Sequence, residues 1–149
     1  PADVDRAVSA ARRAFASWSA TPLAERVALL EKLLEIMKRR NQEMGEAISL
    51  EMGAPIDFAI SDQATCGPWH LEGFLNALKD FDWEHPFTPK GERIVREPVG
   101  VCGLITPWNW PINQIALKVL PAIATGCTCV LKPSEIAPLS AIVFTGMME

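Results

Sequence analysis

The feature that most constrains this sequence is a long apolar stretch in its last third. Between residues 98 and 131, Lys118 is the only charged side chain. The 20 uncharged residues that precede Lys118 in this stretch would be long enough for a membrane helix. Prolines at positions 107 and 111 and three amide side chains interrupt them, which would break such a helix and put polar groups in its middle. We therefore expect this stretch to form the buried core of a soluble domain.

The composition is that of a globular chain. Hydrophobic residues make up 49% of the 149 residues, which is enough for one core and excludes an intrinsically disordered chain. The formal net charge of −4 and the lack of a basic block give no electrostatic reason to expect a nucleic-acid partner. The sequence has no basic segment followed by an apolar run and a cleavage site, so we expect a cytoplasmic protein.

The apolar stretch carries the pattern of a parallel sheet. Continuous apolar runs predict two buried strands at residues 99–105 and 127–131. Residues 112–124 predict a helix that is closed by Gly126, and residues 138–148 predict the next helix. Strands that alternate with helices in this way are typical of a parallel sheet covered by helices, so the expected fold class is α/β.

Amphipathic helices are expected upstream, with charged residues on their solvated faces. Thr21 is the expected N-cap of the second helix, with Pro22 at its first helical position. The third helix is expected to be interrupted near Gly67 and Pro68. The expected helical segments are residues 3–18, 22–52 and 55–79.

An extended segment separates these helices from the apolar stretch. Residues 85–91 are rich in turn-forming residues, and residues 92–97 alternate like an exposed strand. We therefore divide the chain into a helical part at residues 1–83, an extended segment at 84–98 and a strand-and-helix part at 99–149.

Four cysteines, Cys66, Cys102, Cys127 and Cys129, fall in no spacing typical of a metal site, so no metal is expected. Buried, reduced thiols are favoured over a disulfide or zinc chemistry. Cys66 and His70 are four residues apart, which permits contact on a helix. The Gly-Pro pair between them breaks that turn, so a structural role is favoured over a Cys/His nucleophile.

Two short segments with polar side chains follow the predicted strands. Open α/β sheets bind ligands at the carboxyl ends of their strands. In the first segment, Pro107 and Pro111 fix the backbone around Asn109, whose amide could donate to a developing negative charge as an oxyanion hole does. In the second, Lys132 and Glu135 could both bond a nucleotide ribose. The alternative is that the segments are turns with a capping Asn and a surface ion pair.

Several segments resemble one enzyme family. Residues 97–111, with the sequence EPVGVCGLITPWNWP, closely resemble the first nucleotide-binding strand and loop of the NAD(P)-dependent aldehyde dehydrogenase superfamily. Residues 118–126 resemble the family's next helix, and residues 130–135 resemble its next strand and loop. Residues 50–55 resemble the family upstream. The resemblance implies a helical layer packed on the first part of a Rossmann-like parallel sheet, with residues 84–98 reaching toward the oligomerisation arm.

The resemblance also implies roles for individual residues. Asn109 resembles the family's oxyanion donor. Lys118 resembles a lysine that some members use as a proton or charge relay, although a core-facing lysine paired with a carboxylate is the alternative. A carboxylate at Glu135 would repel a 2′-phosphate, which favours NAD over NADP, while nearby cations could offset this preference. The cofactor-binding residues that the resemblance implies are Ile105, Thr106, Pro107, Trp108, Asn109, Lys132, Pro133, Ser134 and Glu135.

The implied activity is the oxidation of an aldehyde to a carboxylic acid with NAD(P)+, by a homodimer or homotetramer. The family's nucleophilic Cys, its general-base Glu and a glycine motif lie downstream of residue 149. We therefore expect an N-terminal fragment that lacks the catalytic domain and is inactive by itself. The alternative is a non-catalytic, truncated nucleotide-binding or assembly fragment.

Overall fold

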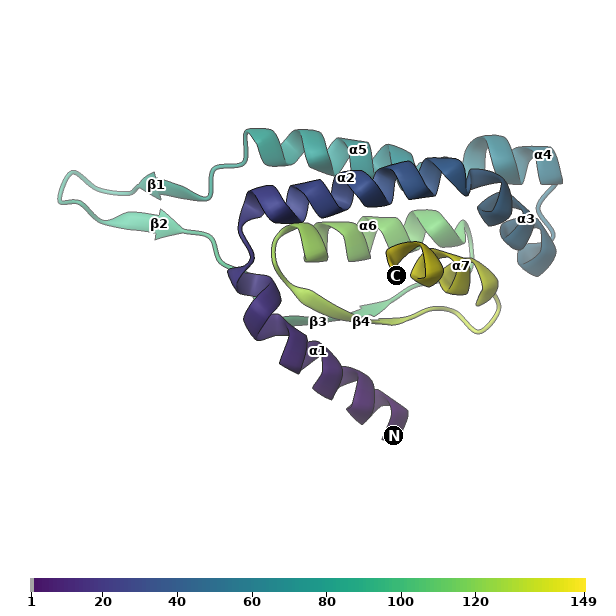
Figure 1. The fold of residues 1–149 in the computed structure, drawn as a ribbon, viewed down its shortest axis with the longest axis horizontal. Coiled ribbons are helices and arrows are strands. Elements are labelled where there is room, and N and C mark those ends of the chain that lie inside the picture. The colour runs from purple at the N-terminus through teal and green to yellow at the C-terminus, as the bar shows by residue number, and fades with distance from the viewer. Residues whose placement is uncertain (1) are drawn as a thin grey trace.

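The computed structural model describes residues 2–149. The first half of the chain is helical, and the second half contains the strands together with two further helices (Figure 1). The elements are α1 (Ala2–Ala20), α2 (Leu23–Arg39), α3 (Asn41–Met52), α4 (Ile56–Phe58), η1 (Ala59–Gln63), α5 (Cys66–Lys79), β1 (Glu84–Pro86), β2 (Arg93–Val95), β3 (Val101–Ile105), α6 (Pro111–Ala124), β4 (Thr128–Lys132) and α7 (Leu139–Met148).

The predicted parallel unit is confirmed. Strands β3 and β4 pair in parallel, and α6 connects them. The register runs from Val101 opposite Thr128 to Ile105 opposite Lys132. Gly126 makes the turn from α6 into β4 with φ of 89°, a left-handed conformation that favours glycine. The carboxyl ends of both strands therefore lie at the same edge of the sheet.

Helices cover both faces of this small sheet (Figure 1). Leu104, Cys129 and Leu131 pack toward the core that contains α6. On the other face, the hydroxyl of Thr128 donates to the main-chain oxygen of Ala11 in α1, 2.9 Å away. The expectation of two buried strands is wrong for the described residues, because most strand residues are half-buried and some are exposed. A two-stranded sheet has two free edges, and α1 covers its outer face incompletely.

The main core lies between α6 and the helices α2, α5 and α7 that pack against it, and α3 adds Met44 and Ile48 to the same core through its contacts with α7. Across residues 2–149, no helix has both the length and the apolar composition that a membrane span requires. The large apolar side chains that are fully buried are Phe144, Ile48, Leu71, Ile112, Ile115 and Leu120.

The predicted N-cap role of Thr21 is wrong. Its hydroxyl donates to the main-chain oxygen of Ser17, 3.0 Å away, and so completes the end of α1. Pro22 takes the N-cap position of α2 and makes no side-chain capping bond. The structure thus uses Thr21 to end one helix rather than to begin the next.

The helical interruption occurs earlier than predicted. A π-helical segment, η1, lies between α4 and α5, while Gly67 and Pro68 lie in the first turn of α5. Proline is tolerated in a first turn because its missing N–H would have no partner within the helix there. A Cβ on Gly67 would meet the Met37 side chain at 2.6 Å, so this glycine permits close packing of α5 on α2.

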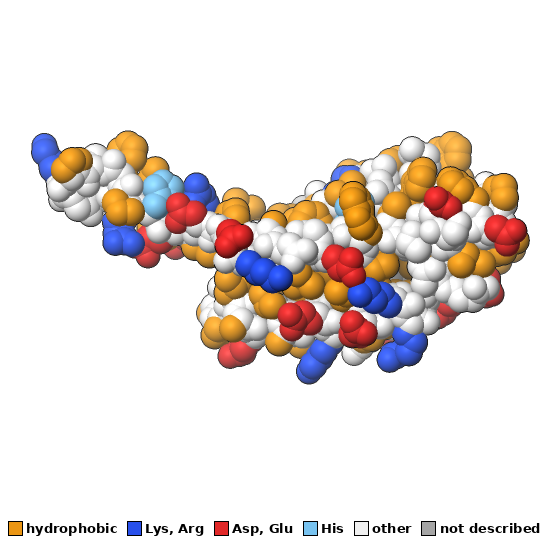
Figure 2. Space-filling model, turned by 90° about the horizontal axis from the view of Figure 1, so that it is seen from above, with side chains coloured by type: hydrophobic (Ala, Val, Ile, Leu, Met, Phe, Trp, Pro, Cys, Tyr) orange, Lys and Arg blue, Asp and Glu red, His pale blue; other side chains and the backbone are white. Residues whose placement is uncertain are grey.

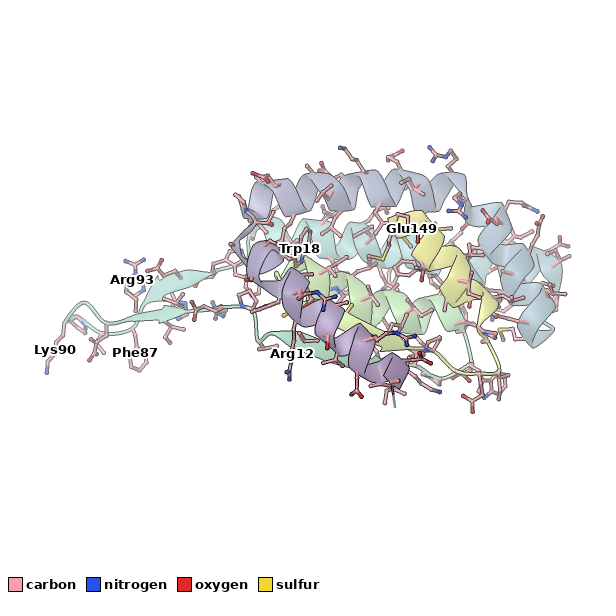
Figure 3. All side chains as sticks on the ribbon, turned by 60° about the horizontal axis from the view of Figure 1, so that its bottom comes forward. Arg12, Trp18, Phe87, Lys90, Arg93 and Glu149 are labelled. Carbon is pink, nitrogen blue, oxygen red and sulfur yellow. The ribbon has the colours of Figure 1, made fainter. Side chains whose placement is uncertain are left out.

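Strands β1 and β2 form an antiparallel hairpin that projects from the helices (Figure 1). The side chains of Glu84 and Arg93 form an ion pair across the hairpin. Phe87 and Val95 are 66% and 57% exposed. Figure 2 shows hydrophobic side chains on the hairpin among charged ones, and Figure 3 shows Lys90 at its tip.

Candidate functional site

The two segments that the sequence singled out lie side by side at the carboxyl edge of the sheet. Ile105 and Lys132 are register partners at the ends of β3 and β4. The N–H of Thr106 donates to the main-chain oxygen of Lys132, 3.3 Å away, so the pairing continues one residue into the first loop. Thr106 is buried. This bond fixes the start of one loop against the start of the other.

A left-handed residue shapes the first loop. Trp110 has φ of 57° and ψ of 63° and is the N-cap of α6. This conformation costs a bulky residue about 1–3 kcal/mol, which the surrounding packing must offset. The Trp110 ring packs edge-on against Phe58 of α4, with ring centroids 5.6 Å apart, and the next residue, Pro111, is buried. Packing on both sides therefore holds the turn that leads into α6.

Asn109 lies immediately before this turn and is exposed. Its backbone is confined by Pro107 on one side and by the left-handed Trp110 on the other. An exposed neutral amide on a confined backbone can donate a hydrogen bond to a charge that develops beside it.

The second loop presents an ion pair. The Lys132 ammonium lies 3.0 Å from the Glu135 carboxylate, and both side chains are exposed. The main-chain N–H of Glu135 itself, and then Lys132, lower the pKa of the Glu135 carboxyl. The hydroxyl of Ser134, which follows Pro133, accepts from the N–H of Ile136 at 3.2 Å and tightens the loop. Glu135 is therefore a carboxylate at neutral pH, able to accept hydrogen bonds.

Exposed apolar side chains accompany these polar groups. Ile105 is 73% exposed beside Lys132, and Trp108 is 46% exposed in the first loop. A nucleotide offers ribose hydroxyls that a carboxylate accepts and an aromatic base that packs on apolar surface. The residues at this edge therefore fit a dinucleotide.

Lys118 lies on α6 and is half-buried. Its ammonium lies 3.4 Å from both the main-chain oxygen and the side-chain oxygen of Gln114. Within residues 2–149, Gln114 is the hydrogen-bonding partner of Lys118, and no carboxylate of this part of the chain forms an ion pair with it.

The Cys66 thiol and His70 do not pair. The thiol donates to the main-chain oxygen of Asp62 at 3.3 Å, and burial raises its pKa. The Nε2 atom of His70 lies 2.7 Å from the side-chain oxygen of Asn113 in α6. In the part of the chain described, no three ligand side chains come close enough to hold a metal ion.

The remaining cysteines lie around the strands. Cys102 in β3 and Cys129 in β4 are register partners. Burial is the main cause that raises the pKa of both thiols. All four thiols are free, but only Cys127 is buried; Cys66, Cys102 and Cys129 are half-buried, so the expectation of four buried thiols is wrong.

Sequence reasoning gave no role to Glu51, at the end of α3. Its carboxylate accepts from the main-chain N–H groups of Leu139 and Ser140, at the start of α7. The segment at residues 50–55 contributed to the resemblance, but a partner 88 positions away leaves no local signal.

An apolar groove of about 950 Å³ lies elsewhere, between α1, α2, α7 and β4. Its lining contains none of the nine predicted cofactor-binding residues. The groove and the loop site are therefore different places.

The whole of residues 1–149 matches the sequence model of the aldehyde dehydrogenase family. The chain belongs to the aldehyde dehydrogenase family. A 3-succinoylsemialdehyde-pyridine dehydrogenase from a Pseudomonas species is 50% identical to it over 147 residues, which cover 98% of this chain and 30% of that relative. The chain spans about 30% of the length of the aldehyde dehydrogenases it matches.

Solved structures of aldehyde dehydrogenases are similar to this chain in sequence and in fold. An aldehyde dehydrogenase from Bartonella henselae is 47% identical, with a TM-score of 0.94 over 98% of this chain and 31% of that one. A mutant of aldehyde dehydrogenase C from Pseudomonas syringae, in complex with NAD+ and octanal, is 48% identical, with a TM-score of 0.95 over 99% of this chain and 30% of that one. The Rossmann-like aldehyde dehydrogenase fold predicted from the sequence is thereby confirmed for this chain.

Proposed function

We propose that this chain supplies part of the cofactor site and the oxyanion donor of an enzyme that oxidises an aldehyde to a carboxylic acid with NAD(P)+. The observation that carries the proposal is the bond from Thr106 to Lys132, which sets the Asn109 loop beside the Lys132–Glu135 loop at one sheet edge. The family match over the whole chain supports a catalytic parent protein and disfavours the non-catalytic alternative.

The second loop would hold the adenosine ribose. The Glu135 carboxylate would accept from ribose hydroxyls while Lys132 donates, and Pro133 and Ser134 would shape the loop. Ile105, Thr106, Pro107, Trp108 and Asn109 would line the cofactor from the first loop. When bound, the nicotinamide cofactor accepts the hydride that leaves the substrate. Glu135 favours NAD over NADP, because its charge repels a 2′-phosphate.

Asn109 would donate its side-chain N–H to the oxyanion that forms when the aldehyde carbonyl is attacked. Two relatives support an aldehyde as the substrate class, since one is a semialdehyde dehydrogenase and the other is bound to octanal.

Lys118 would act as a charge relay. Its two contacts with Gln114 use two of the three N–H donors of the ammonium, which leaves a donor for a further partner. Replacing Lys118 with Met should then alter the pH profile of kcat and not only the stability.

We further propose that the hairpin within residues 84–98 takes part in assembly as a homodimer or homotetramer. The exposed Phe87 and Val95 support an interface there. Sedimentation of the full-length protein should show smaller species for the double variant Phe87→Ser, Val95→Ser. An unchanged assembly would contradict the proposal. The four free thiols favour a reducing compartment such as the cytoplasm.

The proposal that this chain supplies only part of the active site is tested by comparing the activity of the 149-residue chain with that of the full-length protein. The full-length protein should form NADH from NAD+ and an aldehyde. The chain alone should form none above a blank, because none of its four cysteines matches the family's nucleophile and Cys66 is not paired with His70. Turnover by the chain that survives repurification and disappears in Cys66→Ser would contradict this.

A further inference from the structure

Helix α7 is held near both ends by charged residues of α3, Arg40 at the N-cap of α3 and Glu51 in its last turn. At its start, the Glu51 carboxylate accepts from the N–H groups of Leu139 and Ser140, the latter 3.2 Å from Oε1. At its end, the Arg40 guanidinium donates to the main-chain oxygen of Gly146, 2.7 Å away. A negative charge at a helix start and a positive charge at its end both oppose the helix dipole and stabilise the helix. Glu51 and Arg40 therefore hold the first turn and the last turn of α7 against α3.

The start of α7 lies four positions after Glu135, and the residues between them are locked. The N–H of Ala137 donates to the main-chain oxygen of Ser134 at 3.2 Å, and Ala137 is buried. The hydroxyl of Ser134 accepts from the N–H of Ile136. A loop of this length with two internal bonds has little freedom of its own. The position of Glu135 is therefore set by β4 on one side and by the first turn of α7 on the other.

Pro138 is the N-cap of α7 and provides no side-chain capping bond. The first N–H groups of a helix need acceptors from elsewhere, and a carboxylate is a strong one. Glu51 meets this need from a distant part of the sequence, whereas a local Ser or Asp would ordinarily do so. Removing the Glu51 carboxylate would free the start of α7 and, with it, the loop that carries Glu135.

We propose that Glu51 is a positioning residue for the cofactor: by holding the first turn of α7, it holds the Glu135 carboxylate at the ribose. The inference rests on the proposed function, because Glu135 binds ribose only if the protein binds a dinucleotide. Glu51 acts through Glu135 and touches no reacting atom. A residue with a merely stabilising role would lower the melting temperature and leave cofactor affinity unchanged.

Arg40 is the matched control, since it holds the other end of the same helix. Arg40→Met should loosen the end of α7, far from Glu135. Glu51→Ala removes the acceptor, and Glu51→Gln keeps its shape while removing the charge, so that a folded variant is available for comparison. Each variant is made in the full-length protein.

The first measurement is amide hydrogen exchange without cofactor. Glu51→Gln should speed exchange at the N–H groups of Leu139 and Ser140 and in the loop that contains Glu135. Arg40→Met should speed exchange near Gly146 and leave the loop unchanged. Unchanged exchange in the loop of both Glu51 variants would overturn the proposal.

The second measurement is NAD+ affinity by calorimetry, together with kcat and KM. Loss of a cap predicts an increase of about fivefold in the Kd and KM for NAD+ in Glu51→Ala, with a smaller increase in Glu51→Gln. The kcat should stay within about twofold, and Arg40→Met should leave the Kd unchanged. If the wild-type protein binds no NAD+, the proposed function fails. If it binds NAD+ and the folded Glu51 variants bind equally well, the positioning role fails.

Discussion

The guanidinium of Arg26 donates through Nε to the main-chain oxygen of Ala124, 3.1 Å away, where α2 crosses the end of α6. The same buried group donates through Nη1 to the main-chain oxygen of Thr21, at the end of α1. Burial lowers the pKa of Arg26. One cation thus satisfies carbonyl groups at the ends of two helices, where the helix dipole favours positive charge. The Arg26 side chain therefore links the start of α2 to the ends of α1 and α6.

Replacing Arg26 with Met should lower the free energy of unfolding by about 2–4 kcal/mol, because two carbonyl oxygens lose a charged donor. Equilibrium urea unfolding measures this loss. Arg39→Met, at an exposed position of the same helix, is the control and should change stability by less than about 0.5 kcal/mol. Equal effects of the two substitutions would contradict the role assigned to Arg26.

Gly126→Ala should also destabilise the protein, by roughly 1–3 kcal/mol, because the residue has a positive φ. A Cβ there would meet the Pro98 ring at 2.9 Å and the Arg26 guanidinium at 3.3 Å. Gly73→Ala is the matched control, because a Cβ on Gly73 meets nothing within 4 Å and the helix gains a better helix former. The melting temperature should therefore fall for Gly126→Ala and rise for Gly73→Ala. A rise for both would show that the turn tolerates a side chain.

Apolar periodicity predicted α6, α7 and the parallel pair β3 and β4 to within about two residues, because each of them packs apolar side chains against the core. The same pattern could not identify the acceptor of the first N–H groups of α7, since Glu51 is distant in sequence. Thr21 was assigned to the wrong helix because its hydroxyl can bond backwards as well as forwards. The π-helical segment and the left-handed Trp110 depend on packing, in the latter case against Phe58, and have no local signature.

Thiol labelling tests the structural role of the cysteines. Burial raises the pKa of Cys66, Cys102 and Cys129 above the ordinary value of 9.0. A raised pKa keeps a thiol protonated until the pH passes that higher value, and the thiolate is the reactive form. Iodoacetamide at about pH 8 should therefore label these three residues slowly in the folded protein and quickly in urea. Fast labelling of Cys66 in the folded protein would contradict this.

Glu135→Gln, in the full-length protein, should raise the KM for NAD+ and improve the relative use of NADP+, because it removes the charge that repels a 2′-phosphate. The kcat should change little, since the ribose contact is present in the ground state and the transition state alike. Glu31→Gln, at an exposed position on α2, is the control. The KM values for NAD+ and for NADP+ measure this effect. An unchanged ratio between the two KM values would contradict the assignment of Glu135 to the cofactor site.

The kcat of Asn109→Ala in the full-length protein tests the central claim most directly. Asn109 is proposed to donate to an oxyanion that exists only along the reaction path. Its removal should lower kcat by about 10²–10³-fold, or about 3 kcal/mol in the barrier, with a much smaller effect on the affinity for NAD+, because Asn109 is one of nine residues proposed to contact the cofactor, and with the melting temperature nearly unchanged. If the well-folded variant keeps a near-normal kcat, Asn109 is not the oxyanion donor and the loop from Pro107 to Pro111 is a structural turn.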